Sequence, residues 1–501
     1  MLGPKKTSER NLRVGAFVFH DILNMENNFD DNLKRYEAAR SAGSSIYLEP
    51  DELTEIAEYY HLHGKLQKAF EAIDLAITMF PGATQPLAFR ARIALLVNKD
   101  SRDAMQWVNQ IVDKTDLDYY YIVAEIMIAD QRIDEANVFL ESKEEGIEED
   151  DIEDFYLDVA TLFADYSCAD MTEEWLAKSN EKSAPQYREL QGRVALAKGQ
   201  LDACENIFDR LIDEDPYNTD YWNTMASSQY QQGNMEASIE SCDYALAIDP
   251  MNADALVNKA NALSTIGNYT GAIKCYETFQ TLQPYSESAD MGIASVLTAQ
   301  NKFQEALEHL RNAEKLAQAA SPNMCEIIRQ QCILNAQLGK HTEAMANIRK
   351  MDAIPGHDKA ENDVLRGYLF LLDNQPDKAH AWFNRALEAS GNDIRIQTLI
   401  AYTTYECGYT QFAHDLFREI MDKNMGKDVP EGWAFLALCD ADLGLRNEFL
   451  SDLHQAVKQG PAKSRPLLDS IFPKDLSFDS FEKYAKEHPE LGSWPTKTDE
   501  H

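Results

Sequence analysis

The sequence predicts an all-α protein, a solenoid of stacked helix–turn–helix repeats. Two sets of markers carry this prediction. Three prolines follow one another at one fixed interval: Pro216, Pro250 and Pro284. Three glycines lie upstream of them at the same interval: Gly199, Gly233 and Gly267. Two independent markers that keep one period over three units indicate an internal repeat, and a period of this length is typical of helical-repeat proteins.

Each repeat unit reads as two helices joined by a tight turn. In residues 219–252, apolar and small side chains recur at three- and four-residue spacing, first as Trp222, Met225, Ala226 and Tyr230 and then as Ile239, Cys242, Ala245 and Leu246. This spacing places one apolar stripe on each helix. Gly233 is suited to end the first helix because it accepts a left-handed backbone, and Pro250 cannot continue the second. The small residues Ala226 and Ala245 are expected where two helix axes approach closely.

These residues also carry a resemblance to a known family. The order Trp222, Met225, Ala226, Gly233, Ala245 and Pro250 resembles the tetratricopeptide repeat, a 34-residue helix–turn–helix unit. The neighbouring units match at the same offsets, with Gly192, Gly199, Phe208 and Pro216 before it and Ala260, Gly267, Tyr269, Ala272, Tyr276 and Pro284 after it. The resemblance is to multi-repeat solenoids of the bacterial type. It implies a right-handed superhelix in which the first helix of each unit lines the concave face.

The same frame extends outward as weaker copies and predicts about twelve repeats. In order, the predicted parts are a disordered or upstream-start extension at residues 1–24, an N-terminal capping helix at 25–49, partly degenerate repeats at 50–184, regular repeats at 185–320, C-terminal repeats at 321–463, and capping helices with a tail at 464–501. One departure is Phe449, which fills a place where the family prefers alanine. We expect that unit to be splayed or to act as an end cap.

Charge and cysteine usage limit the classes of partner. The chain has 84 acidic and 47 basic residues and a net charge of −37. Such a surface repels phosphate backbones and anionic lipids, so we expect no nucleic-acid or membrane partner, and any steering would favour basic proteins. The eight cysteines form no CxxC pair and fall on apolar or small positions of the predicted helices. Together with the absence of an apolar run of membrane-spanning length, this predicts reduced thiols and a cytoplasmic protein.

The sequence contains no motif of an enzyme active site or cofactor site. Phosphate-binding loops, HExxH, GxSxG and EF-hand patterns do not occur in it. We therefore expect no catalytic residue, no cofactor and no metal. Tryptophans at helical spacing, namely Trp222, Trp382 and Trp433, are expected to be buried packing residues.

The resemblance implies a peptide-binding groove on the concave face. The repeat frame places there the first-helix residues that packing does not use: Arg188, Glu189, Arg193, Asn223, Ser227, Tyr230, Val257, Asn261, Arg329, Tyr368, Arg395, Tyr402 and Tyr405. We expect Arg193, Asn223, Tyr230, Asn261, Tyr368, Tyr402 and Tyr405 to contact a peptide. Asparagine amides can bond a peptide backbone, and Tyr368 and Tyr402, one repeat apart, would form a ladder of rings. The alternative is that these are ordinary solvated or inter-repeat residues.

Two functions from different classes follow from the predicted fold. The first is a non-catalytic scaffold or adaptor that binds partner proteins or peptides in the groove. The alternative is a recruiting or regulatory subunit of an enzyme complex, such as a modifying enzyme, with no catalytic domain of its own. Only Arg193 matches the carboxylate clamp of chaperone-binding members of the family, so binding of a chaperone tail is disfavoured.

Overall fold

The computed structural model describes residues 22–62, 65–96, 100–317, 321, 323–354, 358–424, 429, 431–459, 461–468, 471–473 and 476–491. Over these residues the regular secondary structure is entirely helical. The extension predicted at residues 1–24 lies outside the described residues except for 22–24, which begin the first helix. The chain divides into two compact units, which are described separately. The N-terminal unit runs to Lys302, the C-terminal unit starts at Cys325, and helix α17 (Phe303–Leu316) is shared between them.

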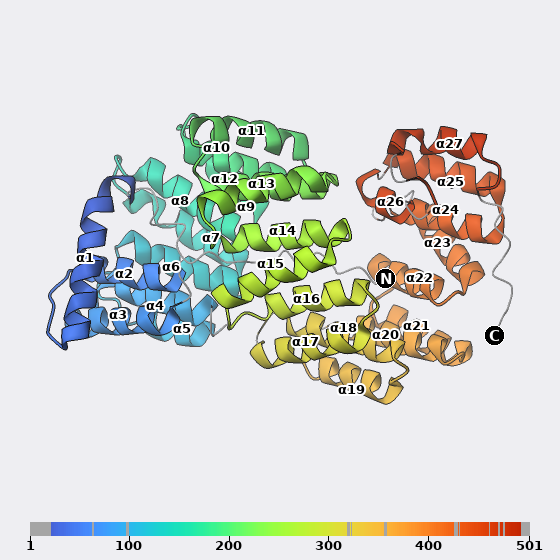
Figure 1. Cartoon of the computed structure of the whole chain (residues 1–501), viewed down its shortest axis with the longest axis horizontal. Helices are drawn as coiled ribbons and strands as arrows, with labels where there is room; N and C mark the ends of the chain where they lie inside the picture. The colour runs from blue at the N-terminus through green and yellow to red at the C-terminus, as the bar shows by residue number, and fades with distance from the viewer. Residues whose placement is uncertain are drawn as a thin grey trace. The chain divides into compact units, whose positions relative to one another are not determined.

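The N-terminal unit begins with a single helix and continues as helix pairs (Figure 1). Its helices are α1 (Ile22–Ala42), α2 (Pro50–Leu62), α3 (Leu66–Met79), α4 (Thr84–Leu96), α5 (Ser101–Val108), α6 (Leu117–Ala129), α7 (Ile133–Glu141), α8 (Ile152–Asp165), α9 (Ala169–Lys178), α10 (Pro185–Ala197), α11 (Leu201–Glu214), α12 (Thr219–Gln232), α13 (Met235–Ile248), α14 (Ala253–Thr265), α15 (Tyr269–Leu282) and α16 (Ser288–Ala299). A short 3-10 turn, η1 (Glu144–Gly146), interrupts the acidic loop between α7 and α8.

The C-terminal unit continues the pairs and ends in two further helices. Its helices are α18 (Met324–Gln337), α19 (His341–Asp352), α20 (Lys359–Leu372), α21 (Pro376–Ala389), α22 (Ile394–Glu406), α23 (Thr410–Asn424), α24 (Gly432–Leu443), α25 (Arg446–Gln459), α26 (Pro461–Leu468) and α27 (Phe481–Glu487), with the 3-10 turn η2 (Phe478–Ser480) before α27. From α2 to α25 the described helices form twelve consecutive pairs. The all-α repeat solenoid predicted from the sequence is confirmed.

Glycine and small residues act in the regular repeats as their positions predict. Gly233 adopts a φ of 85° and ends α12, and Gly267 adopts the same left-handed conformation after α14. Ala226 on α12 and Ala245 on α13 are wholly buried, because a larger side chain would force the two helix axes apart. Local backbone chemistry and close packing therefore agree in these units, which explains why they are the easiest to recognise in the sequence.

Phe449 belongs to an end cap. Its ring is wholly buried in α25, and it shares a hydrophobic cluster with Leu468 on α26 and Phe481 on α27. Both of these terminal helices pack against α25. A large side chain is accommodated there because the last pair is covered by short helices rather than by another complete repeat. The end-cap alternative is therefore the one that the structure supports.

Candidate functional site

The first helices of successive pairs form one continuous layer in the N-terminal unit. Helices α2, α4, α6, α8, α10, α12 and α14 each contact the next in this series. The second helices pack mainly between the first helix of their own pair and that of the next, as α11 does between α10 and α12. The resemblance to tetratricopeptide repeats implies that this layer of first helices is the inner, concave one. We call this layer the inner wall.

A buried ion pair ties three repeats of the inner wall together. Arg92 Nε on α4 donates to Glu125 Oε2 on α6 at 3.0 Å, and both side chains are only 8% exposed. The hydroxyl of Tyr166, at the end of α8, donates to the other oxygen of Glu125 at 3.3 Å. Burial raises the pKa of Glu125, while Arg92 opposes this rise by stabilising the charged carboxylate. These contacts join α4, α6 and α8.

Further carboxyl groups crowd the same wall. Burial raises the pKa of Glu58 on α2 to about 7; Arg92 lowers it and Asp118 raises it further. The pKa of Asp118 on α6 is also raised, again chiefly by burial. On α8, burial raises the pKa of Asp158 to about 7, although the hydroxyl of Tyr121 donates to its Oδ2 at 3.1 Å. The ionised forms of these carboxyls are therefore disfavoured, because cationic neighbours do not fully compensate for their burial.

The sequence analysis did not single out these carboxyl groups. Glu58 lies in a nearly complete repeat, whereas Asp118 and Asp158 lie in degenerate repeats that only alanine and tryptophan positions mark in the sequence. A signal was present nevertheless, since Glu58 and Arg92 are separated by one repeat length and Glu125 follows after nearly the same interval. These steps match the repeat period, so charged side chains at this interval on successive first helices could have identified the wall.

Three of the predicted groove residues are bonded to neighbouring repeats. Arg193 on α10 forms an ion pair with Asp165 on α8, with 2.6 Å between Nη2 and Oδ1. Asn223 on α12 is only 4% exposed because its amide donates to the Oδ1 of Asn252, which caps α14. The hydroxyl of Tyr230 lies 3.4 Å from Thr265 Oγ1. The inter-repeat role, held open as the alternative, is therefore present at each of these positions.

Asn261 turns toward the second helix of its own repeat. Its Oδ1 accepts a hydrogen bond of 2.5 Å from the hydroxyl of Tyr276 on α15. The sequence interpretation had placed Asn261 away from the packing contacts, and this hydrogen bond corrects that placement. The side chain remains partly exposed on the inner wall.

The three predicted tyrosines of the C-terminal unit lie on first helices and are largely packed. Tyr368 on α20 is only 8% exposed. Tyr402 and Tyr405 on α22 both meet the ring of Phe435 on α24, at centroid distances of 5.4 and 6.3 Å. Burial raises the pKa of all three phenols. Inter-repeat packing thus uses much of the predicted ladder of rings, and its binding role stays a prediction.

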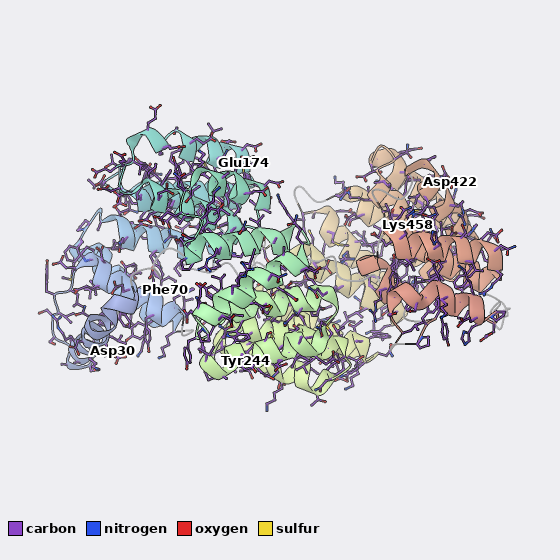
Figure 2. The ribbon with its side chains drawn as sticks, turned by 90° about the horizontal axis from the view of Figure 1, so that it is seen from above. Asp30, Phe70, Glu174, Tyr244, Asp422 and Lys458 are labelled. Carbon is purple, nitrogen blue, oxygen red and sulfur yellow. The ribbon has the colours of Figure 1, made fainter. Side chains whose placement is uncertain are left out.

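Trp222 does not have the buried position that the sequence predicts for it. It lies in the first turn of α12, partly exposed, and its indole donates to the carbonyl of Pro216 at 2.9 Å. Its ring stacks on Tyr244 of α13 with centroids 4.6 Å apart. Tyr244 is itself 49% exposed and is labelled in Figure 2. The expectation failed because an indole so close to the helix end extends over the preceding loop instead of entering the core.

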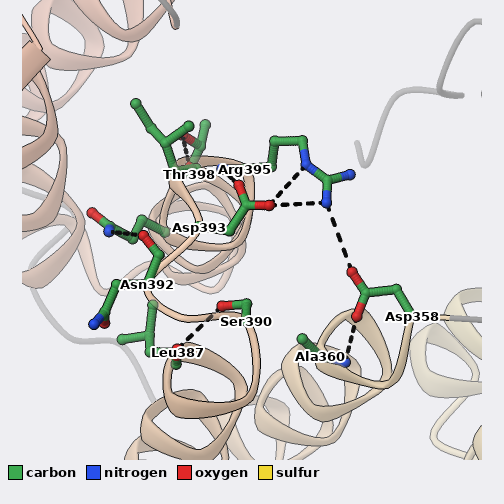
Figure 3. A network of polar contacts seen from close by, with 10 residues as sticks. Asp358, Ala360, Leu387, Ser390, Asn392, Asp393, Arg395 and Thr398 are labelled. Atoms are coloured by element: carbon green, nitrogen blue, oxygen red, sulfur yellow. Dashed lines mark hydrogen bonds and ion pairs between the residues drawn. The ribbon is translucent and has the colours of Figure 1, made fainter.

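Arg395, also placed in the groove by the repeat frame, joins the starts of two first helices (Figure 3). Its guanidinium lies 3.0 Å from Asp393, which caps α22, and 3.8 Å from Asp358, which caps α20. The side chain is mostly exposed, so the pairing is a surface contact of small energetic value. It links the N-terminal ends of α20 and α22, two successive first helices.

The described residues contain neither a metal site nor a membrane-spanning helix. No three His, Cys, Asp or Glu side chains there are grouped as a metal ion would require. None of the helices in these ranges has both the length and the apolar character needed to cross a bilayer. Within the same ranges, none of the eight cysteines forms a disulfide.

The fold and its inner wall define a helical-repeat solenoid, the class of protein that presents a continuous surface built from repeated units. A family model described as tetratricopeptide repeat matches residues 189–253 and 257–323. These residues contain tetratricopeptide repeats, as the resemblance in the sequence implied. No curated protein matches the chain.

The chain is similar to several solved structures, and three of them show how much of this chain such similarity covers. A tetratricopeptide repeat protein from Parabacteroides merdae is 19% identical and has a TM-score of 0.39, covering 50% of this chain and 98% of its own. Pseudomonas aeruginosa pilF is 17% identical with a TM-score of 0.35, covering 43% and 96%. The APC/C hetero-tetramer Cut9–Hcn1 is 13% identical with a TM-score of 0.36, covering 90% and 94%.

Proposed function

We propose that this chain is a non-catalytic, cytoplasmic scaffold whose inner wall binds a basic segment of a partner protein. One observation carries the proposal: Glu58, Asp118 and Asp158 lie on three first helices of one wall, and burial raises the pKa of each. A Lys or Arg side chain placed among them would stabilise the ionised carboxylates. The wall therefore favours a cation, whereas its charge disfavours an acidic or phosphorylated segment.

The proposed binding is linked to protons. The pKa of Glu58 and that of Asp158 are both about 7 in the free protein, so each carboxyl is about half protonated at neutral pH. A bound cation lowers both pKa values, and the complex then holds fewer protons than the free protein. Affinity should accordingly fall as the pH is lowered below 7. Above about pH 8 it should become independent of these two groups.

The residues predicted from the repeat frame extend the proposed surface beyond the acidic part of the wall. They are Arg193, Asn223, Tyr230, Asn261, Tyr368, Tyr402 and Tyr405. Their exposed portions would contact the partner segment outside its basic part. The limited exposure of Asn223 and Tyr368 makes them weaker candidates for direct contact than Tyr230 or Asn261. We also propose that the regular repeats span residues 185–320 and that a less regular set of repeats lies on each side of them.

The test uses a fluorescent peptide of alternating Lys and Ala residues and its counterpart with Glu in place of Lys. The full chain should bind the Lys peptide and not the Glu peptide. A variant with Glu58→Gln and Asp158→Asn should lose about tenfold in affinity, which corresponds to about 1.4 kcal/mol. The matched control carries Glu174→Gln and Glu236→Gln, two exposed glutamates on second helices, and should bind as the unmodified protein does.

Calorimetry in two buffers of different ionisation enthalpy should show proton release on binding at pH 7. Equal affinity of both peptides, or no loss in the wall variant, would show that the inner wall is not the binding surface. Binding without proton release would show that Glu58 and Asp158 do not face the ligand.

A further inference from the structure

Three exposed apolar side chains occupy the same place in three successive repeats. Tyr217, Met251 and Tyr285 each follow the proline that ends a second helix, and they are 78%, 56% and 69% exposed. They lie in the loops that lead into α12, α14 and α16. We call these three side chains the loop edge. They lie on a different part of the repeat from the inner wall. A loop that leads into a first helix lies at the edge where the helices begin, and the inner wall is formed by the sides of the first helices.

In the first two of these loops, an aspartate side chain closes the turn that carries the exposed residue. The backbone N–H of Tyr217 donates to Asp215 Oδ1 at 3.2 Å, and that of Met251 donates to Asp249 Oδ1 at 2.9 Å. Each aspartate lies at the end of the preceding second helix, and its side chain accepts the hydrogen bond that closes the turn. The proline between the aspartate and the exposed residue restricts the backbone of the same turn. A polar residue would satisfy the same turn, and an exposed Tyr or Met is not required by the fold.

The exposed apolar residues are concentrated at such loops. Among the described residues ten large hydrophobic side chains are exposed, and five of them lie in a loop that leads into a first helix: Tyr47, Val112, Tyr217, Met251 and Tyr285. The partly exposed pair formed by Trp222 and Tyr244 adds aromatic surface beside the first of the three regular loops, because Trp222 bonds the carbonyl next to Tyr217. Single exposed hydrophobic residues need no explanation, but a row of them at one repeated position indicates an interaction surface.

The spacing of the row suits a helical ligand. Helices α12 and α14 are in direct contact, which sets about 8–10 Å between their axes and therefore between equivalent loops. On an α-helix, residues seven apart lie on one face and are separated by about 10.5 Å. A β-strand presents alternate residues on one face at intervals of about 6.7 Å, which does not match. An α-helix with an apolar residue every seven positions can therefore contact Tyr217 and Met251 together, and the 34-residue period continues the row to Tyr285.

The charges beside the row specify the flanks of that helix. Asp215 and Asp249 lie at the ends of second helices, and Asp220 and Asp254 lie in the first turns of first helices. Tyr217 and Met251 therefore each have an aspartate at the end of the preceding second helix and another in the first turn of the following first helix, whereas Tyr285 follows Gln283 and has only Asp290 in the first turn of α16. Lys or Arg on both sides of an apolar stripe would complement them. A second copy of this chain is disfavoured as the occupant, since the net charge of each copy is −37.

We propose that the loop edge formed by Tyr217, Met251 and Tyr285 is a second docking surface, which binds a basic amphipathic helix of a partner protein. This surface is independent of the inner wall. A chain with both surfaces holds two segments at once, one basic segment on the wall and one amphipathic helix on the edge. Joining two segments, from one partner or from two, is then the scaffold's specific role.

The test uses the full chain and a fluorescein-labelled helical peptide of about 18 residues, long enough for apolar residues at three heptad-spaced positions. It has Leu at heptad spacing and Lys on both flanks of the Leu stripe. Tyr217→Ser, Met251→Ser and Tyr285→Ser combined should lower its affinity at least tenfold without changing the circular dichroism spectrum. The control combines Val138→Ser and Leu372→Ser, which are also exposed apolar residues, and should change the affinity less than twofold.

Two comparisons separate this surface from the inner wall. The variant with Glu58→Gln and Asp158→Asn should bind the helical peptide as the unmodified chain does. Hydrogen exchange should show protection by the peptide in residues 215–218, 249–252 and 283–287, and not in α2 to α8. Undiminished binding by the triple serine variant would overturn the proposal. So would equal binding of a scrambled peptide, tighter binding of a proline-rich peptide, or self-association that the triple variant abolishes.

Discussion

Replacing Glu58 by glutamine should stabilise the fold while weakening the binding of a basic ligand. The pKa of Glu58 is raised from 4.5 to about 7, chiefly by burial. A carboxyl whose pKa is higher in the folded state binds its proton more tightly there than in the unfolded chain. The folded state is therefore favoured at low pH and loses stability as the pH rises from 4.5 through 7. Glutamine has nearly the same shape and carries no charge, so it removes this loss.

The size of the effect follows from the pKa difference. A difference of about 2.5 in pKa corresponds to about 3 kcal/mol when the carboxyl is ionised in both states, as it is at pH 8. At pH 5.5 the folded protein keeps Glu58 mostly protonated, and linkage reduces the cost to about 1.5 kcal/mol. Glu58→Gln should therefore raise the free energy of unfolding by up to about 3 kcal/mol at pH 8. At pH 5.5 the gain should be about half as large.

Urea denaturation followed by circular dichroism at pH 5.5, 7 and 8 measures this dependence. Glu174→Gln is the control, because this glutamate is exposed on α9 (Figure 2) and its replacement should change stability by no more than about 0.5 kcal/mol. Repeat arrays need not unfold in one step, so the transition that reports the N-terminal unit must be compared in both variants. A loss of stability at pH 8, or an effect equal at all three pH values, would refute the claim that burial destabilises an ionised Glu58.

Two further predictions concern packing and the buried ion pair. Gly367→Ala should destabilise the C-terminal unit by about 1–3 kcal/mol, because the added carbon would overlap the ring of Phe383. In the control Gly146→Ala, the added carbon meets no atom within 4 Å, and stability should hardly change. Equal changes in thermal unfolding for the two variants would contradict this packing. Glu125→Gln should lower the free energy of unfolding by about 3 kcal/mol, because it removes the carboxylate that pairs with the buried charge of Arg92. Chemical denaturation measures this change. An unchanged denaturation midpoint would show that the ion pair contributes little to stability.

The regular repeats were predictable because each local signal in them has one structural meaning. The backbone at Gly233 has a positive φ, the proline at 250 cannot continue α13, and Ala245 has room for no larger side chain. The end cap could be predicted only as one of two alternatives. The large residue at 449 shows that another repeat does not follow in the usual way, but it does not show which helices replace it.

The inner wall was harder to predict because its chemistry depends on which first-helix side chains meet across repeats. The repeat frame places Asn261 on the right helix, but it does not fix the rotation that brings its amide to Tyr276. The wall carboxyl groups lie on the first helices of different repeats, far apart in the sequence. Their raised pKa values arise from burial and from neighbours on other helices, which a single helix's periodicity does not reveal.

The carboxyl groups of the inner wall and the apolar side chains of the loop edge lie in different repeats and affect stability differently. Each carboxyl group buried on the wall lowers the stability of the free protein at neutral pH, and a cationic ligand would restore that stability by lowering its pKa. An exposed Tyr or Met on the loop edge affects stability little and leaves apolar surface in water, which a ligand would cover. Binding at the wall should therefore depend on pH near 7, whereas binding at the edge should depend on apolar area and show a negative heat-capacity change. This difference gives each surface its own signature, so that a partner found in future can be assigned to one of them from solution measurements alone.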